Sequence, residues 1–160
     1  SDVCSSDLNT GTETLEDVVY RRVMDWDVPP TEFNEYVSHY GVKSNLEVMG
    51  GNIRYASDNG FASSNPESAA GYMDYSTINT DFVQKGPLDH GSVFDLAFGN
   101  IAAGASRMFN IFYGAAATLQ AAKDSIAALH PTAWSFGQST TYSSGGGGGG
   151  EMEKIGRAHV

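Results

Sequence analysis

The sequence predicts an all-β protein, an immunoglobulin-like antiparallel β-sandwich with one short α-helix at about residues 116–129. Several segments of this 160-residue chain alternate apolar and polar side chains with a period of two, and Gly, Pro, Asn and Asp clusters separate them. Only one segment repeats its apolar residues at helical spacing. The length is that of one sandwich domain. We therefore expect residues 9–142 to form a single β-sandwich domain.

The strongest strand signal is the run 18–28, which we expect to be a long central strand. Its even positions are apolar apart from Arg22, whereas its odd positions include Asp25 and Asp27. Because alternate residues of a strand point to opposite faces, one face should pack and the other should meet water or a ligand. Pro29 ends the run, since proline has no amide hydrogen for a sheet ladder.

Other segments complete the predicted elements. Apolar alternation or strand-forming composition marks further strands at 32–40, 45–49, 52–56, 92–98, 106–113 and 133–137. In the predicted helix, Leu119, Ala122 and Ile126 recur at helical spacing, and Pro131 prevents its continuation. Turn-forming residues predict a loop over 57–69.

The two ends of the chain are related through the genetic code. A nucleotide string that encodes residues 1–8 encodes residues 154–160 when its opposite strand is read, and it resembles a sequencing-library adapter. We expect both segments to be non-native and adapter-derived, and the domain to be truncated at both ends, which would leave sheet edges open. The only cysteine, Cys4, belongs to this part. Residues 143–153 are glycine-rich, and we expect them to be flexible.

The charge balance narrows the classes of partner. The formal net charge is -10, so the chain lacks the basic footprint that nucleic acid and anionic membrane surfaces require. No apolar run reaches the length of a membrane span, and we expect no membrane insertion. An acidic balance with few lysines is typical of extracellular bacterial proteins. We expect no nucleic-acid partner and a location outside the cell or on its surface.

Four aspartates are candidate calcium ligands. Asp25 and Asp27 share one strand face with Cα atoms about 7 Å apart, and Asp58 and Asp89 lie in Asp-Asn-Gly and Asp-His-Gly loops. Carboxylate oxygens on such loops suit a hard cation. The alternative is that the strand pair is solvated and that the loops are ordinary turns, in which Asp and Asn cap the backbone. The loops do not match EF-hand spacing.

Arg22 is a candidate for a structural ion pair. It occupies an even position of the strand, and a buried guanidinium needs an acidic partner, for which Asp95 and Asp89 are the candidates. A bulge next to Arg22 would turn it outward instead. His90 adjoins Asp89, but the chain has no Gly-x-Ser-x-Gly elbow and no histidine pair at zinc spacing.

Four motifs stand out along the chain: YRRVMDWD with PTEF, DNGFAS with NP, DHGSVFD, and FNIFYGAA. Together they span most of residues 15–137, and in combination they resemble a domain of secreted bacterial proteins that carry a PEP-CTERM sorting signal. The chain departs from that family at Gly145–Gly150. The resemblance implies an exported or surface protein, and it supplies no catalytic residues.

These observations predict a non-catalytic β-sandwich module of an exported protein with a structural, adhesive or extracellular-matrix role. Its partners would be extracellular polysaccharide or other surface proteins, and it would require no cofactor. The alternative is a calcium-dependent carbohydrate-binding module that uses the four aspartates and exposed aromatic rings. A hydrolase is the third candidate.

Overall fold

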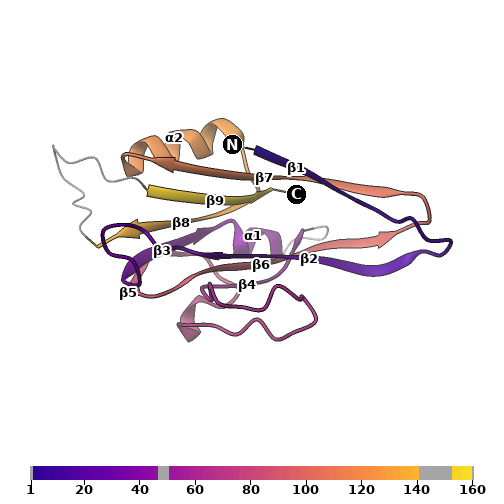
Figure 1. The fold of residues 1–160 in the computed structure, drawn as a ribbon, viewed down its shortest axis with the longest axis horizontal. Coiled ribbons are helices and arrows are strands. Elements are labelled where there is room, and N and C mark those ends of the chain that lie inside the picture. Colours follow the sequence, from indigo (N-terminus) through magenta and orange to yellow (C-terminus); the bar gives the residue numbers. More distant parts are fainter. Residues whose placement is uncertain (1, 47–50, 141–152, 160) are drawn as a thin grey trace.

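The computed structural model describes residues 2–46, 51–140 and 153–159 of the chain. Within these residues the protein is an antiparallel β-sandwich with a short helix, α2, against it, as the sequence predicts (Figure 1). One sheet has the strand order β1-β7-β9-β8-β3-β5, and the other has the order β2-β6-β4. The immunoglobulin-like assignment stays a prediction.

The strands are β1 Asp2–Leu8, β2 Leu15–Asp25, β3 Glu35–Tyr40, β4 Ile53–Ser57, β5 Phe82–Leu88, β6 Gly91–Ile101, β7 Ser106–Ala116, β8 Ala133–Ser139 and β9 Glu153–His159. The helices are α1 Val42–Leu46 and α2 Leu119–Leu129, and a 3-10 turn lies at Tyr75–Thr77. The predicted helix therefore begins three residues late, because residues up to Ala116 still belong to β7 and Thr118 caps the helix. The single turn of α1 was not predicted.

The core lies between the two sheets. The alternate β6 residues Phe94, Leu96 and Phe98 are buried there with residues of β7, and the rings of Tyr20, Phe98 and Phe109 pack against one another. Their alternation follows the period that predicted this strand. The expectation that β2 is central was wrong, because β6 lies between β2 and β4. Hydrophobic alternation indicates which face of a strand is buried, but it does not indicate which strands pair with that strand in the sheet.

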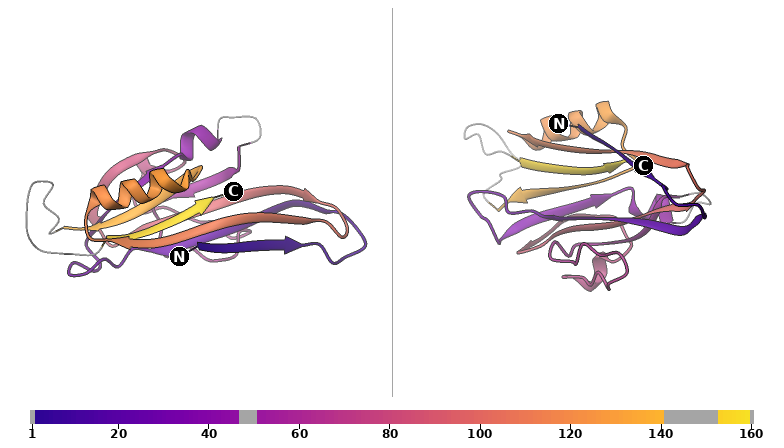
Figure 2. Two further views of the ribbon diagram at one scale, coloured as in Figure 1. Left: turned by 90° about the horizontal axis from the view of Figure 1, so that it is seen from above. Right: turned by 45° about the vertical axis from the view of Figure 1, so that its right-hand side comes forward.

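The outer surfaces of the sandwich differ. Helix α2 packs Ala122 and Ile126 against Phe136 of β8 on the six-stranded sheet. On the other side, the connection between β4 and β5, residues 58–81 (the β4–β5 loop), lies beside the three-stranded sheet away from the six-stranded one (Figures 1 and 2). This loop positions most of the groups described below.

Both chain ends form strands. Residues 2–8 pair with β7 as the edge strand β1, and residues 153–159 form β9 between β7 and β8. Their adapter origin stays a prediction, and the predicted flexible segment 143–153 lies outside the described residues apart from its last position. β1 and β2, although consecutive, belong to different sheets, so they do not form a hairpin.

Candidate functional site

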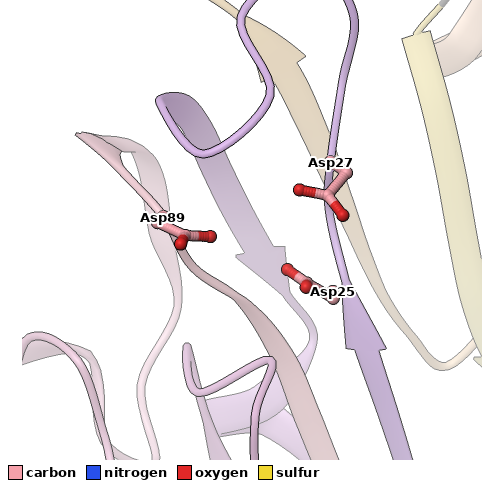
Figure 3. Close-up of side chains that lie close together, drawn as sticks. All are labelled: Asp25, Asp27 and Asp89. Atoms are coloured by element: carbon pink, nitrogen blue, oxygen red, sulfur yellow. The ribbon is translucent and has the colours of Figure 1, made fainter.

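Three of the four predicted calcium ligands come together at one end of the three-stranded sheet. One carboxylate oxygen from each of Asp25, Asp27 and Asp89 lies within 4.8 Å of the others. All three residues are half-buried, and their carboxylates are turned toward a common space (Figure 3). The acidic cluster is therefore defined by Asp25, Asp27 and Asp89.

The convergence follows from strand alternation and sheet register. Trp26 and Val28 are 1% exposed because they pack inward on Val37, and this turns Asp25 and Asp27, which alternate with them, to the opposite side. Asp25 is paired with Gly91 in the β2–β6 ladder, and Asp89 precedes that glycine by two residues. The register thus brings the end of β2 to the segment that enters β6.

Two glycines allow the backbones to meet at this point. A Cβ atom at Gly91 would collide with the carbonyl oxygen of Met24, and one at Gly60 would lie 3.1 Å from the Cα atom of Asp25. The backbone amide of Gly91 donates to the carbonyl of Asp58 at 2.9 Å. The Asp-Asn-Gly and Asp-His-Gly motifs therefore act here as close-packed turns, with glycine at each position of contact.

The acidic cluster has the dimensions of a site for one hard cation. Calcium binds oxygen ligands at about 2.4 Å, so two ligands of the same ion lie at most about 4.8 Å apart. Three carboxylates offer up to six oxygens, and calcium takes about 6–8, which leaves room for water. Close carboxylates also repel one another, and a divalent cation would relieve that repulsion.

Asp58 does not join this cluster, contrary to the prediction. Its carboxylate is fully buried and accepts hydrogen bonds from the backbone amides of Met73 at 2.8 Å and Asp74 at 3.0 Å. Its Oδ2 atom also lies 3.4 Å from Nδ1 of His90. Burial alone would raise the pKa of Asp58, but these hydrogen bonds outweigh it and lower that pKa. Asp58 holds the β4–β5 loop from inside the protein.

His90 and Asp58 form a sealed pair. The side chain of His90 is fully buried, and its Nε2 atom lies 3.2 Å from the carbonyl oxygen of Glu35. Both ring nitrogens therefore face protein groups. An acid–base reaction at this pair would require the sandwich to open, since neither side chain has a surface that a substrate can reach.

Two further buried titratable groups were not recognised in the sequence. Glu35 Oε1 accepts the backbone amide of His90 at 3.3 Å, and burial raises the pKa of Glu35 to about 7. His39 lies between the rings of Phe82 and Phe94, with centroids 4.3 and 5.0 Å away, and burial lowers its pKa to about 3. Alternation in β3 could have placed both side chains inward, but β3 reads as an ordinary polar strand.

Asp95 forms a structural ion pair, as predicted, but its partner is Arg21 and not the predicted Arg22. Arg21, and not Arg22, binds Asp95, with Nε to Oδ1 at 2.6 Å and Nη2 to Oδ2 at 2.8 Å. These side chains are only 2% and 8% exposed. Arg22 faces the inner side of the sheet, where its guanidinium lies 4.7 Å from the ring centroid of Tyr113. Asp89, the other candidate partner, belongs to the acidic cluster.

The β4–β5 loop explains why Arg21, and not Arg22, forms the buried ion pair. It covers the outer face of β2 and β6, on which Arg21 and Asp95 are directly paired. Arg21 Nη1 also donates to the loop carbonyls of Ser63 at 3.2 Å, Asn65 at 2.8 Å and Ser68 at 2.8 Å. One buried guanidinium therefore connects the sheet to three points of the loop.

These features define an antiparallel β-sandwich with an acidic cluster at one end of its three-stranded sheet. The β4–β5 loop, held by Arg21, lies over the outer face of the same sheet. No protein-family model matches the chain, and neither a curated protein nor a solved structure does. Among the described residues, neither α1 nor α2 has the length and apolarity that crossing a membrane demands.

Proposed function

We propose that this chain is a non-catalytic β-sandwich module of an exported protein, with a structural, adhesive or extracellular-matrix role. The observation that carries the proposal is the use of its interior charged groups. Arg21 and Asp95 hold the β4–β5 loop, and Asp58 and His90 close its base from inside. Arginine, aspartate and histidine side chains serve catalysis in many enzymes, but these four stabilise the scaffold.

The proposed setting outside the cell rests on the sequence. The formal net charge of -10 and the resemblance to PEP-CTERM proteins support an exported or surface location. Extracellular polysaccharide and other surface proteins are the proposed partners.

The test of a non-catalytic role compares activity with stability. Asp58→Asn should lower the melting temperature, because it weakens a buried acceptor of three hydrogen bonds, and the wild-type protein should release no product from ester or glycoside substrates. Hydrolysis by the wild type that is lost in Asp58→Asn at unchanged melting temperature would establish an enzyme instead.

Calcium binding at the acidic cluster is the second candidate function, and the convergence of Asp25, Asp27 and Asp89 favours it. A ligand that binds only the folded state stabilises it by about 2.7 kcal/mol at a concentration of 100 times its Kd. Thermal melts in calcium and in chelator should therefore differ for the wild type.

Two matched variants locate the effect. Asp89→Asn should abolish the calcium-dependent rise in melting temperature, whereas Asp124→Asn, which changes an exposed aspartate on α2, should keep it. Identical melts of the wild type in calcium and in chelator would rule the cation site out.

A further inference from the structure

We propose that the groove between the β4–β5 loop and the outer face of the three-stranded sheet binds a neutral polysaccharide chain. The groove has a volume of about 1030 Å³, and its lining includes Arg54, Tyr55 and Tyr72. The inference names a ligand class for the adhesive role proposed above, and it rests on that role.

The groove is separate from the acidic cluster. Arg21 and Asp95 lie at the groove, whereas Asp25 lies four residues further along β2, about 13 Å away for an extended strand. None of the three cluster aspartates lines the groove. Binding there should therefore not require calcium.

The loop wall of the groove is held in place before any ligand arrives. The carbonyl of Gly71 accepts hydrogen bonds from the hydroxyls of Tyr55 at 2.7 Å and Ser57 at 2.6 Å, and the side-chain amide of Asn59 donates to the carbonyl of Ala70 at 2.7 Å. Arg21 fixes the preceding part of the same loop. Long loops with little regular structure are uncommon unless they serve binding, and a preorganised wall lowers the entropic cost of association.

The wall carries exposed aromatic surface. Tyr72 lines the groove and is 46% exposed, and its ring meets that of Tyr75 edge-on with centroids 5.0 Å apart. Tyr75 is 74% exposed. Tyrosine presents a flat apolar face with a polar tip, which suits the C–H faces and hydroxyl groups of a sugar ring. A groove-lining ring that is supported by a second exposed ring differs from an isolated surface aromatic residue, which needs no explanation.

The charged groups of the groove favour a neutral chain over an anionic one. On the rim, Arg54 donates to Asp17 at 2.6 Å, and this pair offers planar donors and acceptors to hydroxyl groups. Two guanidinium groups line the groove together with four carboxylates, those of Glu16, Asp17, Glu67 and Asp95. The excess of carboxylates repels polyanions such as alginate.

Affinity electrophoresis in gels that contain β-1,3-glucan, β-1,4-mannan or alginate tests the proposal. We expect at least one neutral polysaccharide to retard the wild type, in calcium and in chelator alike, and alginate not to do so. Tyr72→Ala should weaken retention about tenfold, which corresponds to about 1.4 kcal/mol. Phe61→Ala, which removes another exposed aromatic ring (55%) outside the groove lining, should retain the wild-type affinity.

Several outcomes would overturn the proposal: no retardation by either neutral polysaccharide, equal retardation of Tyr72→Ala and the wild type when circular dichroism shows both folded, loss of retention in chelator, or preference for alginate. Assay of reducing ends in the same samples separates this proposal from the proposed function. Retention with release of reducing ends would support the groove and contradict the non-catalytic role, whereas absence of both would remove the groove alone.

Discussion

At the scale of single residues, Arg21 shows how the free-energy cost of burying a charged side chain can be offset. Burying a guanidinium and a carboxylate costs several kcal/mol each, and the attraction between them repays this only with good geometry and further hydrogen bonds. Arg21 has both, because it makes a two-pronged contact with Asp95 and also donates to loop carbonyls. Removing one partner of such a pair should cost about 3–5 kcal/mol.

Glu35 and His39 predict opposing pH dependences of stability. The folded state raises the pKa of Glu35 from 4.5 to about 7, so its contribution to stability is present below pH 4.5 and is lost as the pH rises through 7. The folded state lowers the pKa of His39 from 6.5 to about 3, so its contribution is present above pH 6.5 and is lost as the pH falls through 3.

Glu35→Gln should reveal the contribution of His39 to the pH dependence of the free energy of unfolding. Between pH 4.5 and 6.5 the two slopes offset each other in the wild type, whereas the variant's free energy of unfolding should rise with pH, by at most about 1.4 kcal/mol per pH unit. Urea unfolding in chelator at several pH values measures this. Parallel profiles for the variant and the wild type would contradict the assignment.

Alternation predicted which face each charged residue of β2 occupies, but not that a loop covers part of the outer face. Arg22 does lie on the inner face, as its even position indicates, and Arg21 lies on the outer one. The error concerned the outer face, which is covered by a loop that folds back from residues 58–81. Such coverage depends on long-range packing, and the local pattern of β2 carries no signal for it.

At the scale of elements, close contact between β8 and the segment after β2 is set by one glycine. A Cβ atom at Gly137 would lie 2.7 Å from the Cβ atom of Trp26, which is 1% exposed and donates its indole N–H to Ser135 Oγ at 3.0 Å. The strand and the indole therefore approach more closely than any side chain on residue 137 permits.

Gly137→Ala should destabilise the protein by about 1–3 kcal/mol, because the added methyl group overpacks the core against Trp26. Gly114→Ala is the matched control, since nothing lies within 4 Å of a Cβ atom at that position of β7. Chemical denaturation of both variants measures the difference. Equal stabilities would show that the indole moves aside without cost.

The acidic cluster was predictable in part. Period-two alternation placed Asp25 and Asp27 on one face, and the turn motif indicated Asp89 as a possible third ligand. Asp58 carries the same type of motif, but its carboxylate turns inward to meet backbone amides of its own loop. A turn motif indicates the backbone conformation, whereas the direction of the side chain depends on the tertiary environment.

At the scale of the whole molecule, the two terminal strands occupy unequal positions. β9 pairs on both sides, with β7 and β8, whereas β1 pairs with β7 alone. The sequence predicted sandwich layers and a helix, but it did not predict this order. Pairing order depends on contacts between distant segments, which local periodicity does not encode.

Shortening the chain should therefore have unequal effects. Removing residues 153–160 should lower the melting temperature more than removing residues 1–8, because the first change takes away the strand that joins β7 to β8 and opens an edge on each of them, whereas the second exposes one edge of β7. Thermal melts with light scattering compare the two. Equal melting temperatures without aggregation would show that β9 contributes no more than an edge strand.

The central claim is that interior charged groups hold the β4–β5 loop as a fixed part of this module, and hydrogen exchange over residues 58–81 tests it most directly. In the wild type, the amides of Met73 and Asp74, which bind Asp58, should be protected almost as well as the amides of β6. In Arg21→Lys, which cannot reproduce the forked contact, exchange should accelerate throughout the loop before the sandwich unfolds. Fast exchange of the loop in the wild type, or unchanged protection in the variant, would contradict the account.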